Sequence, residues 1–214
     1  KCPRLTQYIR ETSRKKVKRY LNCTYWGKPL PGFGDAKAKL LIIGLAPAAH
    51  GGNRTGRLFT GDDSGNWLVK ALYENGFANK PTSLDRNDGL RLCSTYITAA
   101  VRCAPPGNKP TKTEFENCSE YLKEELTRLK QVEMVVTLGK LSFDSYLANV
   151  ELPAGRRKPA FKHGVIYDFG KGLPMLASSY HPSRQNTQTG KMTWPMWMGT
   201  FRKIRRILDG NGIP

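Results

Sequence analysis

Three segments of the sequence combine glycine-rich or turn-forming backbone with side chains that can bind a ligand. The first covers residues 44–62 (GLAPAAHGGNRTGRLFTGD), and its glycines let the backbone approach a ligand closely. The second covers residues 103–110 (CAPPGNKP), and the third covers residues 181–190 (HPSRQNTQTG). A histidine imidazole and an aspartate carboxylate, as at His181 and Asp62, can stabilise charge or move a proton during a reaction. Loops of this composition are where binding and catalysis usually take place.

Buried strands are predicted to position these segments. A continuous apolar, β-branched run predicts a strand that begins near residue 39. Further strands are predicted over residues 95–101, 132–138 and 175–180. Helices are predicted over 64–77, from residue 111, over 140–148 and over 193–208, with Ser64 capping the first and a capping box at Thr111 starting the second. This alternation predicts an α/β fold, a three-layer α/β/α sandwich with a short, mostly parallel central sheet. The three segments should converge at the carboxyl ends of the strands, where such sheets bind ligands.

The net charge of the chain indicates which kind of partner it binds. The chain has 214 residues, with 35 Lys and Arg against 17 Asp and Glu, which gives a formal charge of +18. Such a surplus repels itself unless a polyanion is the usual partner, so we expect nucleic acid. The cations gather in residues 14–19, 156–158 and 202–206, which predicts a folded basic face. The alternative is a solvated basic surface that binds nothing.

Composition also excludes several classes of protein. With 39% hydrophobic residues the chain can form a core, which excludes a disordered or fibrous protein. The longest apolar run is about half of what a membrane-spanning helix needs, and no secretion signal opens the chain. We therefore expect one intracellular domain over residues 1–214. We also expect a monomer in the cytoplasm or nucleoid of a prokaryote. The sequence starts at Lys1 without a methionine, which suggests that an N-terminal piece is missing.

The three segments closely resemble the signature motifs of the uracil-DNA glycosylase superfamily, and in particular those of its type-5 branch. The likeness extends from Cys2 to the final helix, and the order and spacing of the segments agree. The resemblance implies the α/β sandwich expected above. It also implies a monofunctional DNA glycosylase of base excision repair, which flips a damaged base out of the duplex and lets water attack the sugar. The alternatives are a non-catalytic binder of uracil-containing DNA on the same scaffold, and a zinc-stapled module without a base pocket.

The resemblance assigns roles to individual residues. Phe59 matches the family's stacking aromatic residue, although it could be an ordinary core phenylalanine. His181 matches the histidine that hydrogen-bonds the departing base and stabilises its developing anion. Asp62 is expected to polarise water or to stabilise the oxocarbenium-like sugar, and it could also cap the next helix. The remaining assignments are base or backbone contacts at Gly44, Ala46, Pro47, Asn108 and Asn186, and DNA contacts at Arg184 and Gln185. Asn108 could instead be a turn residue.

The chain differs from the superfamily's stricter uracil enzymes at two places. Residues 46–49 are alanine and proline where those enzymes carry a polar residue, and Ala99 stands where they carry asparagine. The type-5 branch shares these losses and accepts a broader set of deaminated bases. A pocket with fewer obligatory hydrogen bonds rejects fewer wrong bases, because fewer buried partners are left unpaired. We expect uracil first, with hypoxanthine, xanthine or modified pyrimidines as further substrates.

Cysteines predict a metal cofactor. The five cysteines stand at positions 2, 23, 93, 103 and 118, too irregularly for a disulfide framework. In the superfamily's bacterial and archaeal branches, the pair matching Cys103 and Cys118 joins an N-terminal Cys-x-x-Cys in a [4Fe-4S] cluster. Cys2 matches the second cysteine of that motif, and the fourth ligand is either a cysteine ahead of it or Cys23. Zinc is the alternative metal. The expected role is structural, and Cys93 is expected to be a plain buried thiol.

Overall fold

The centre of the molecule is a six-stranded sheet in the order β1-β3-β2-β4-β6-β5. This computed structural model describes residues 1–170 and 172–210. The strands are β1 (Phe33–Gly34), β2 (Leu40–Gly44), β3 (Thr95–Ala99), β4 (Met134–Leu138), β5 (Val165–Tyr167) and β6 (Met175–Ser179). The four inner strands run parallel, and the short edge strands β1 and β5 pair antiparallel with their neighbours. The predicted short, mostly parallel sheet is therefore confirmed.

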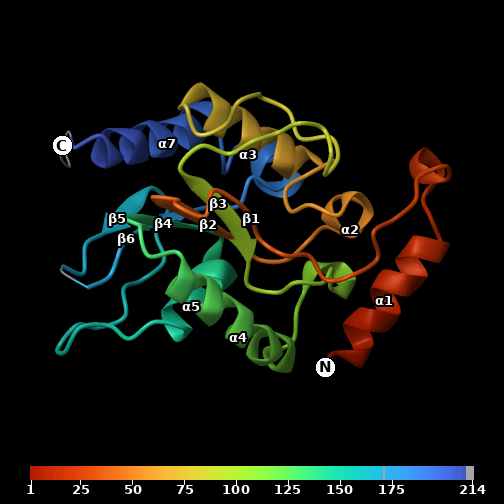
Figure 1. The fold of residues 1–214 in the computed structure, drawn as a ribbon, viewed down its shortest axis with the longest axis horizontal. Coiled ribbons are helices and arrows are strands. Elements are labelled where there is room, and N and C mark those ends of the chain that lie inside the picture. Colours follow the sequence, from red (N-terminus) through yellow and green to blue (C-terminus); the bar gives the residue numbers. More distant parts are fainter. Residues whose placement is uncertain (171, 211–214) are drawn as a thin grey trace.

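Helices cover both faces of the sheet and complete a three-layer sandwich (Figure 1). The long ones are α1 (Pro3–Arg14), α3 (Asp63–Glu74), α4 (Lys112–Arg128), α5 (Lys140–Ala148) and α7 (Trp194–Leu208). The short ones are α2 (Gly52–Thr55) and α6 (Arg184–Gln188), with 3-10 turns at Lys18–Tyr20 and Pro106–Asn108. In Figure 1, α3 and α7 lie on one face of the sheet and α4 and α5 on the other.

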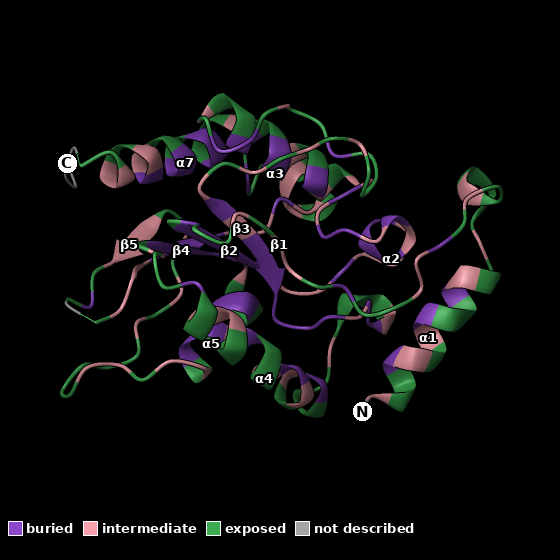
Figure 2. Cartoon of the chain, viewed as in Figure 1, coloured by how far each residue is buried: buried purple, intermediate pink, exposed green. Residues whose placement is uncertain are grey.

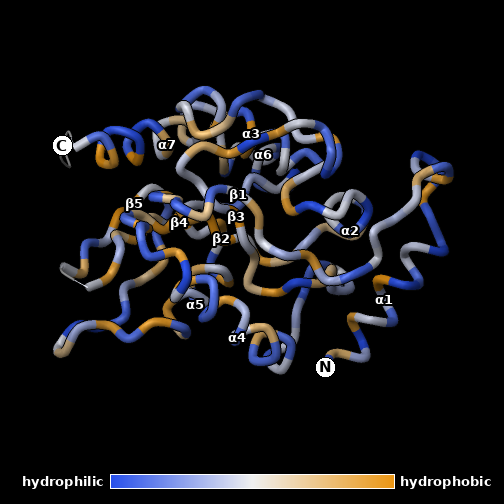
Figure 3. The backbone as a smooth tube through the Cα atoms, viewed as in Figure 1, coloured by the Kyte–Doolittle hydropathy of each residue, from blue (hydrophilic) through white to orange (hydrophobic). Residues whose placement is uncertain are grey.

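The core lies on both faces of β2, and this explains why its sequence is apolar throughout. Leu40 and Ile42 pack in the cluster that contains α3 and α7, whereas Leu41 and Ile43 pack in the cluster that contains α4 and α5. All four side chains are 0% exposed. The inner strands are buried in Figure 2, and hydrophobic residues gather around the sheet in Figure 3. Among the described residues, no helix is both long enough and apolar enough to cross a membrane.

Two predictions were wrong in detail, and one helix was missed. The cap of α3 is Asp62 and not Ser64, because the Asp62 Oδ1 accepts a hydrogen bond from the backbone N–H of Gly65 at 2.8 Å. This confirms the capping role that was the alternative for Asp62. Helix α1 was not predicted, and it lies beside the sandwich (Figure 1). The three basic segments do not form one face. Figure 1 shows residues 14–19 at the end of α1 on the right, whereas residues 156–158 and 202–206 lie on the left, before β5 and in α7.

Candidate active site

The first and third segments begin at the carboxyl ends of parallel strands. Gly44 ends β2 opposite Ala99 of β3, and Ser179 ends β6 opposite Leu138 of β4. Backbone pairing continues beyond Gly44, because the N–H of Ala100 donates to the Gly44 carbonyl at 2.9 Å. The two segments therefore leave the sheet at the same edge, as predicted.

The ring of Phe59 is held in a seat made by glycines. Its φ of +49° is a strained conformation for an aromatic residue, so the surroundings must enforce it. A Cβ at Gly44 would lie 2.7 Å from the Phe59 ring, and a Cβ at Gly65 would collide with the Phe59 backbone. Phe59 is only partly buried, although the flanking Leu58 and Thr60 are 1% and 0% exposed. The glycines thus position an aromatic ring that keeps part of its surface open.

His181 follows β6 and lies beside this ring. Its ring centroid is 6.0 Å from that of Phe59, with an interplanar angle of 32°. A flat base sandwiched between two rings needs a spacing of about 7 Å, twice the roughly 3.5 Å contact distance of carbon atoms. A base therefore cannot lie between the rings. A base that stacks on Phe59 and also contacts His181 must therefore meet His181 with its edge, which is the geometry of a hydrogen bond.

Burial keeps the His181 imidazole neutral. Although part of its surface stays open, the ring is surrounded by protein atoms, and this desolvation lowers the pKa of His181 to about 4. At neutral pH the ring therefore carries one N–H donor and no charge. A neutral donor fixed in place can stabilise negative charge that develops on a ligand.

Side chains around His181 hold the third segment against α3. The Asn186 Nδ2 donates to the His181 carbonyl at 2.8 Å, and the Ser64 Oγ donates to the Pro182 carbonyl at 3.1 Å. Arg184 forms an exposed ion pair with Asp63 at 2.7 Å. In this structure Asn186 is thus a positioning residue, and the predicted contacts of Asn186 and Arg184 with DNA stay predictions.

The two oxygen atoms of the Asp62 carboxylate have different surroundings. Its Oδ1 caps α3, while its Oδ2 lies so close to Gly51 that any Cβ at that position would collide with it. Burial raises the pKa of the Asp62 carboxyl, and the hydrogen bond from the Gly65 N–H opposes that rise. A carboxylate with a raised pKa at a ligand-binding edge can accept a proton from water.

A buried ion pair that the sequence analysis missed supports the turn at Phe59. The Arg57 Nη2 lies 2.8 Å from the Asp88 Oδ2, with side chains only 7% and 5% exposed. Arg57 also donates to the hydroxyls of Thr60 and Ser83 at 3.0 and 2.9 Å. This network ties the residues on both sides of Phe59 to a distant loop. Aspartate at position 88 carries no local sequence signal of this role.

We expect Asp88→Asn to lower the free energy of unfolding by about 3 kcal/mol, because it leaves the buried Arg57 charge without its partner. Urea unfolding measures this. The control is Asp144→Asn, which breaks an exposed ion pair with Lys140 and should change stability by less than about 1 kcal/mol. Equal effects of the two variants would contradict the importance of the buried pair.

The same pair predicts a dependence of stability on pH. Burial alone would raise the pKa of Asp88, but bonds from Arg57 and from the N–H groups of Leu84 and Leu90 outweigh it and lower the pKa to about 2. The unfolded chain takes up this proton near the ordinary pKa of about 4, so the stabilisation is complete above that pH and is lost as the pH falls towards 2. Unfolding curves of Asp88→Asn should show less pH dependence in this window.

Sequence comparison places the chain among known proteins. It matches the uracil DNA glycosylase superfamily model over residues 31–203, which is most of its length. The chain belongs to the uracil-DNA glycosylase superfamily. A type-5 uracil-DNA glycosylase of Thermus thermophilus is 46% identical over 208 residues, covering 96% of this chain and 92% of that protein. One of Pyrobaculum aerophilum is 47% identical over 193 residues, covering 90% and 81%. A type-4 enzyme of the latter organism is 32% identical over 195 residues, covering 88% and 86%. The expected superfamily and type-5 branch are confirmed.

Not every residue assigned by the superfamily resemblance lies at the Phe59 and His181 pair. Asn108 is exposed, with a φ of +57° in the turn Pro106–Asn108, as the turn interpretation expects. Ala46 packs against the cluster of Leu5, Val101 and Cys118, and Pro47 is buried. Gln185 is exposed on α6. Their contacts with a base or with DNA remain predictions.

Three of the cysteines come together. Cys2 at the start of α1, Cys103 after β3 and Cys118 on α4 share one packing cluster. Helix α1 reaches α4 through Arg4, which pairs with the capping-box Glu114 at 2.7 Å. Among the described residues, no three His, Cys, Asp or Glu side chains are arranged so that they could hold a metal ion.

The other two cysteines lie apart from this cluster. Cys23 follows the 3-10 turn beyond the far end of α1, and its N–H bonds to the Tyr20 carbonyl at 3.1 Å. Cys93 is exposed, so the expectation of a buried thiol there was wrong. It lies two residues before the amino end of β3.

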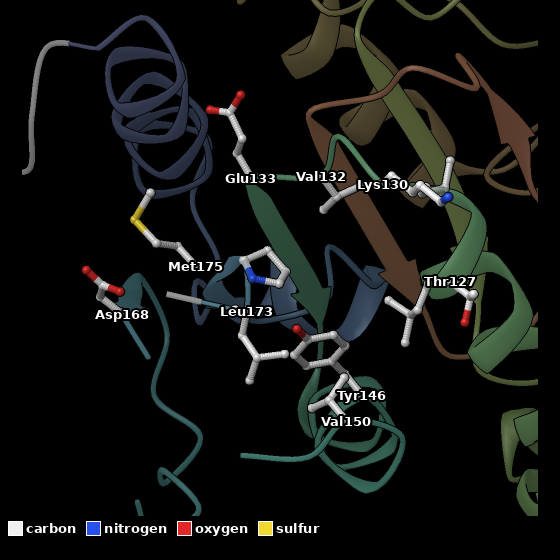
Figure 4. Close-up of a pocket in the computed structure, with 13 residues that line it drawn as sticks. Thr127, Lys130, Val132, Glu133, Tyr146, Val150, Asp168, Leu173 and Met175 are labelled. Carbon is white, nitrogen blue, oxygen red and sulfur yellow. The ribbon is translucent and has the colours of Figure 1, made fainter. Parts of the chain in front are cut away.

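A separate cavity of about 710 Å³ lies away from the candidate site (Figure 4). It is lined by Glu133 and Met175 from the amino ends of β4 and β6, together with Tyr146 and Leu173. His181 and Phe59 lie at the opposite, carboxyl edge of the sheet. The cavity is therefore not where a base would meet His181.

Proposed function

We propose that this chain is a monofunctional uracil-DNA glycosylase, which acts on uracil-containing DNA inside the cell. The observation that carries the proposal is the pairing of a seated, partly open Phe59 with a neutral His181 in a chain of this superfamily. The relatives named type-5 uracil-DNA glycosylases support uracil as the base. A flipped uracil stacks on the Phe59 ring and directs its edge towards His181.

In the proposed reaction, the bond between the sugar C1′ and uracil N1 breaks, and its electron pair leaves with the uracil. The His181 N–H donates a hydrogen bond to the uracil oxygen on which this negative charge accumulates. Water adds to C1′, and its proton passes to the Asp62 carboxylate. Asp62 also stabilises the positive charge that develops on the sugar before water adds. Asp62 then returns its proton to solvent, and the uracil anion takes up a proton from solvent, so the products are free uracil and an abasic strand that stays intact.

We infer a substrate range that includes hypoxanthine and xanthine. The end of β3 presents Ala99 and Ala100, which are 1% and 2% exposed and offer no side-chain hydrogen bond to a base. A wall without obligatory partners leaves no group unpaired when a different base enters. Single-turnover rates on duplexes containing uracil, hypoxanthine, xanthine or thymine test this. We expect uracil to be fastest, the two purines to be released measurably, and thymine not to be released. Release of uracil alone would contradict the broad range.

We also propose that Cys2, Cys103 and Cys118 hold a [4Fe-4S] cluster, for which the three thiols must move from the arrangement that the structure describes, because that arrangement does not form a metal site. Burial raises the pKa of Cys103 to about 11, with Cys118 and Cys2 adding to the rise, so thiolates here need positive charge beside them. Iron supplies that charge when bound, and four thiolates are the usual requirement. The three thiols would tie α1 to α4 and to the segment after β3. Cys23 lies outside their packing cluster, so its candidacy as the fourth ligand has no support from their arrangement.

Iron and sulfide analysis of protein purified without oxygen tests the cluster. We expect Cys103→Ser to lose iron and to speed amide hydrogen exchange at the start of α1, because the cluster would tie Cys2 to α4 and to the segment after β3. Cys93→Ser, which removes an exposed thiol outside the group, should keep both at the wild-type level. Wild-type protein that contains zinc in place of iron, or no metal, would contradict the proposal.

A further inference from the structure

We propose that residues 14–21 (RKKVKRYL), here named the basic tip, bind the phosphate backbone of duplex DNA beside the flipped base. This inference rests on the proposed function and adds a DNA-binding surface to it. The tip projects at the end of α1, at the right of Figure 1. Five of its eight residues are cations, and none of the eight is acidic. None of these cations forms an ion pair with any residue that the structure describes.

The basic tip is attached directly to the first segment of the active site. The Arg54 guanidinium lies over the Tyr20 ring at 4.0 Å from its centroid. The same Arg54 side chain donates to the carbonyls of His50 at 2.8 Å and Gly61 at 3.2 Å. Gly61 directly precedes Asp62 and follows Phe59 by two residues. A chain of contacts therefore connects the basic tip to the turn that contains Phe59 and Asp62.

Two further contacts hold the strand of chain that leaves the tip. The Tyr25 hydroxyl hydrogen-bonds the His50 Nδ1 at 2.9 Å, and the Trp26 N–H donates to the Arg54 carbonyl at 3.0 Å. Helix α2, which contains Arg54, is thus flanked by the segment from Tyr20 to Trp26. These contacts therefore fix the basic tip next to the first segment of the site, so the tip is not a free tail.

Charge complementarity identifies the occupant of this surface. A duplex whose base enters the Phe59 seat must extend past both sides of the site, and it carries one phosphate charge per about 1.7 Å of axis. The surface continues beyond the tip at Trp26, whose ring lies under Arg86 at 4.6 Å and near Lys28 at 5.6 Å. Cations alternating with aromatic rings suit a sugar-phosphate backbone, because cations pair with phosphates and rings pack on sugars.

The test compares two triple variants that remove the same charge. The first is Lys15→Gln/Lys18→Gln/Arg19→Gln in the tip. The control is Arg156→Gln/Arg157→Gln/Lys158→Gln, which neutralises three exposed cations in the loop before β5, on the other side of the molecule (Figure 1). Binding is measured across a salt series with a duplex that carries a stable abasic-site analogue. Thermal unfolding checks that both variants fold.

We expect the tip triple to reduce the slope of log K against log salt by roughly 2 to 3, because each phosphate contact contributes about 0.9. The control should change the slope by less than about 1. Arg19→Gln alone should give about a third of the full effect. Shortening the duplex on one side of the abasic analogue should abolish the difference between wild type and the tip triple.

Two outcomes would overturn the inference. One is a tip triple with the wild-type slope, and the other is an equal reduction in both triples, which would reflect net charge alone. A uracil-release assay on the same samples separates this inference from the function on which it rests. If the wild-type protein releases uracil and the tip triple has the wild-type salt slope, DNA binding by the basic tip is contradicted and the proposed function is not. Wild-type protein that releases no uracil would overturn the proposed function.

Discussion

Replacing His181 by alanine is expected to lower the single-turnover rate of uracil release at least about a hundredfold while leaving duplex binding largely intact. The reason is that one preorganised hydrogen-bond donor, which acts on charge formed only in the transition state, typically contributes a factor of about 10²–10³. The imidazole is neutral because burial lowers the pKa of His181 to about 4. Rates and affinities measured on the same uracil-containing duplex give the two quantities.

A second substitution at this position separates a donor from a merely structural side chain. His181→Asn should recover part of the lost rate, because the asparagine side chain retains an N–H donor. Both substitutions leave the hydrogen bond from Asn186 to the backbone carbonyl of residue 181 in place. An equal loss of binding and of release in His181→Ala would instead make His181 a docking or folding residue. No recovery in His181→Asn would leave the stabilising hydrogen bond without support.

Asp62→Asn is expected to lower the rate of uracil release by about 10², because it removes the group that accepts the proton from water. The stability of the protein should hardly change, since asparagine caps a helix about as well as aspartate. Asp62→Ala should show the same loss of rate together with a loss of about 1 kcal/mol in stability, because α3 then has no cap. Asp62→Asn with the wild-type rate would show that Asp62 is only a cap.

The pH profile gives an independent view of the same residue. Burial raises the pKa of Asp62 above its ordinary value of about 4, and catalysis needs the ionised form. The wild-type rate should therefore fall as the pH drops through that raised pKa, and the Asp62→Asn profile should lack this decline. A decline of the same shape in both proteins would assign it to another group.

The inner part of the fold could be predicted because its sequence signals are local. β2 and β4 are apolar apart from Thr137, and the capping box of α4 is complete in the structure. The edge strands β1 and β5 have two and three residues, too few for a periodic pattern. Helix α1 buries only Leu5, Ile9 and Thr12 and depends on the Arg4–Glu114 pair, so its surroundings stabilise it more than its own composition.

The candidate site could be predicted in its residues but not in its supports. Phe59 and His181 were found because they stand in long motifs, and their proximity follows from the parallel sheet. The pair of Arg57 and Asp88 joins residues 31 positions apart, and no local pattern announces such a contact. Gly65 is needed because a Cβ at this position would collide with the Phe59 backbone, and this contact can be recognised only in the folded structure.

The most direct test of the account is incubation of the purified protein with a duplex that carries one uracil, followed by alkali. Our account predicts free uracil in the reaction and a strand that is cut at the uracil position only after alkali, with an undamaged duplex left whole. Tight binding of the uracil duplex with no free uracil and no alkali-sensitive position would contradict it and would make the protein a binder of damaged DNA.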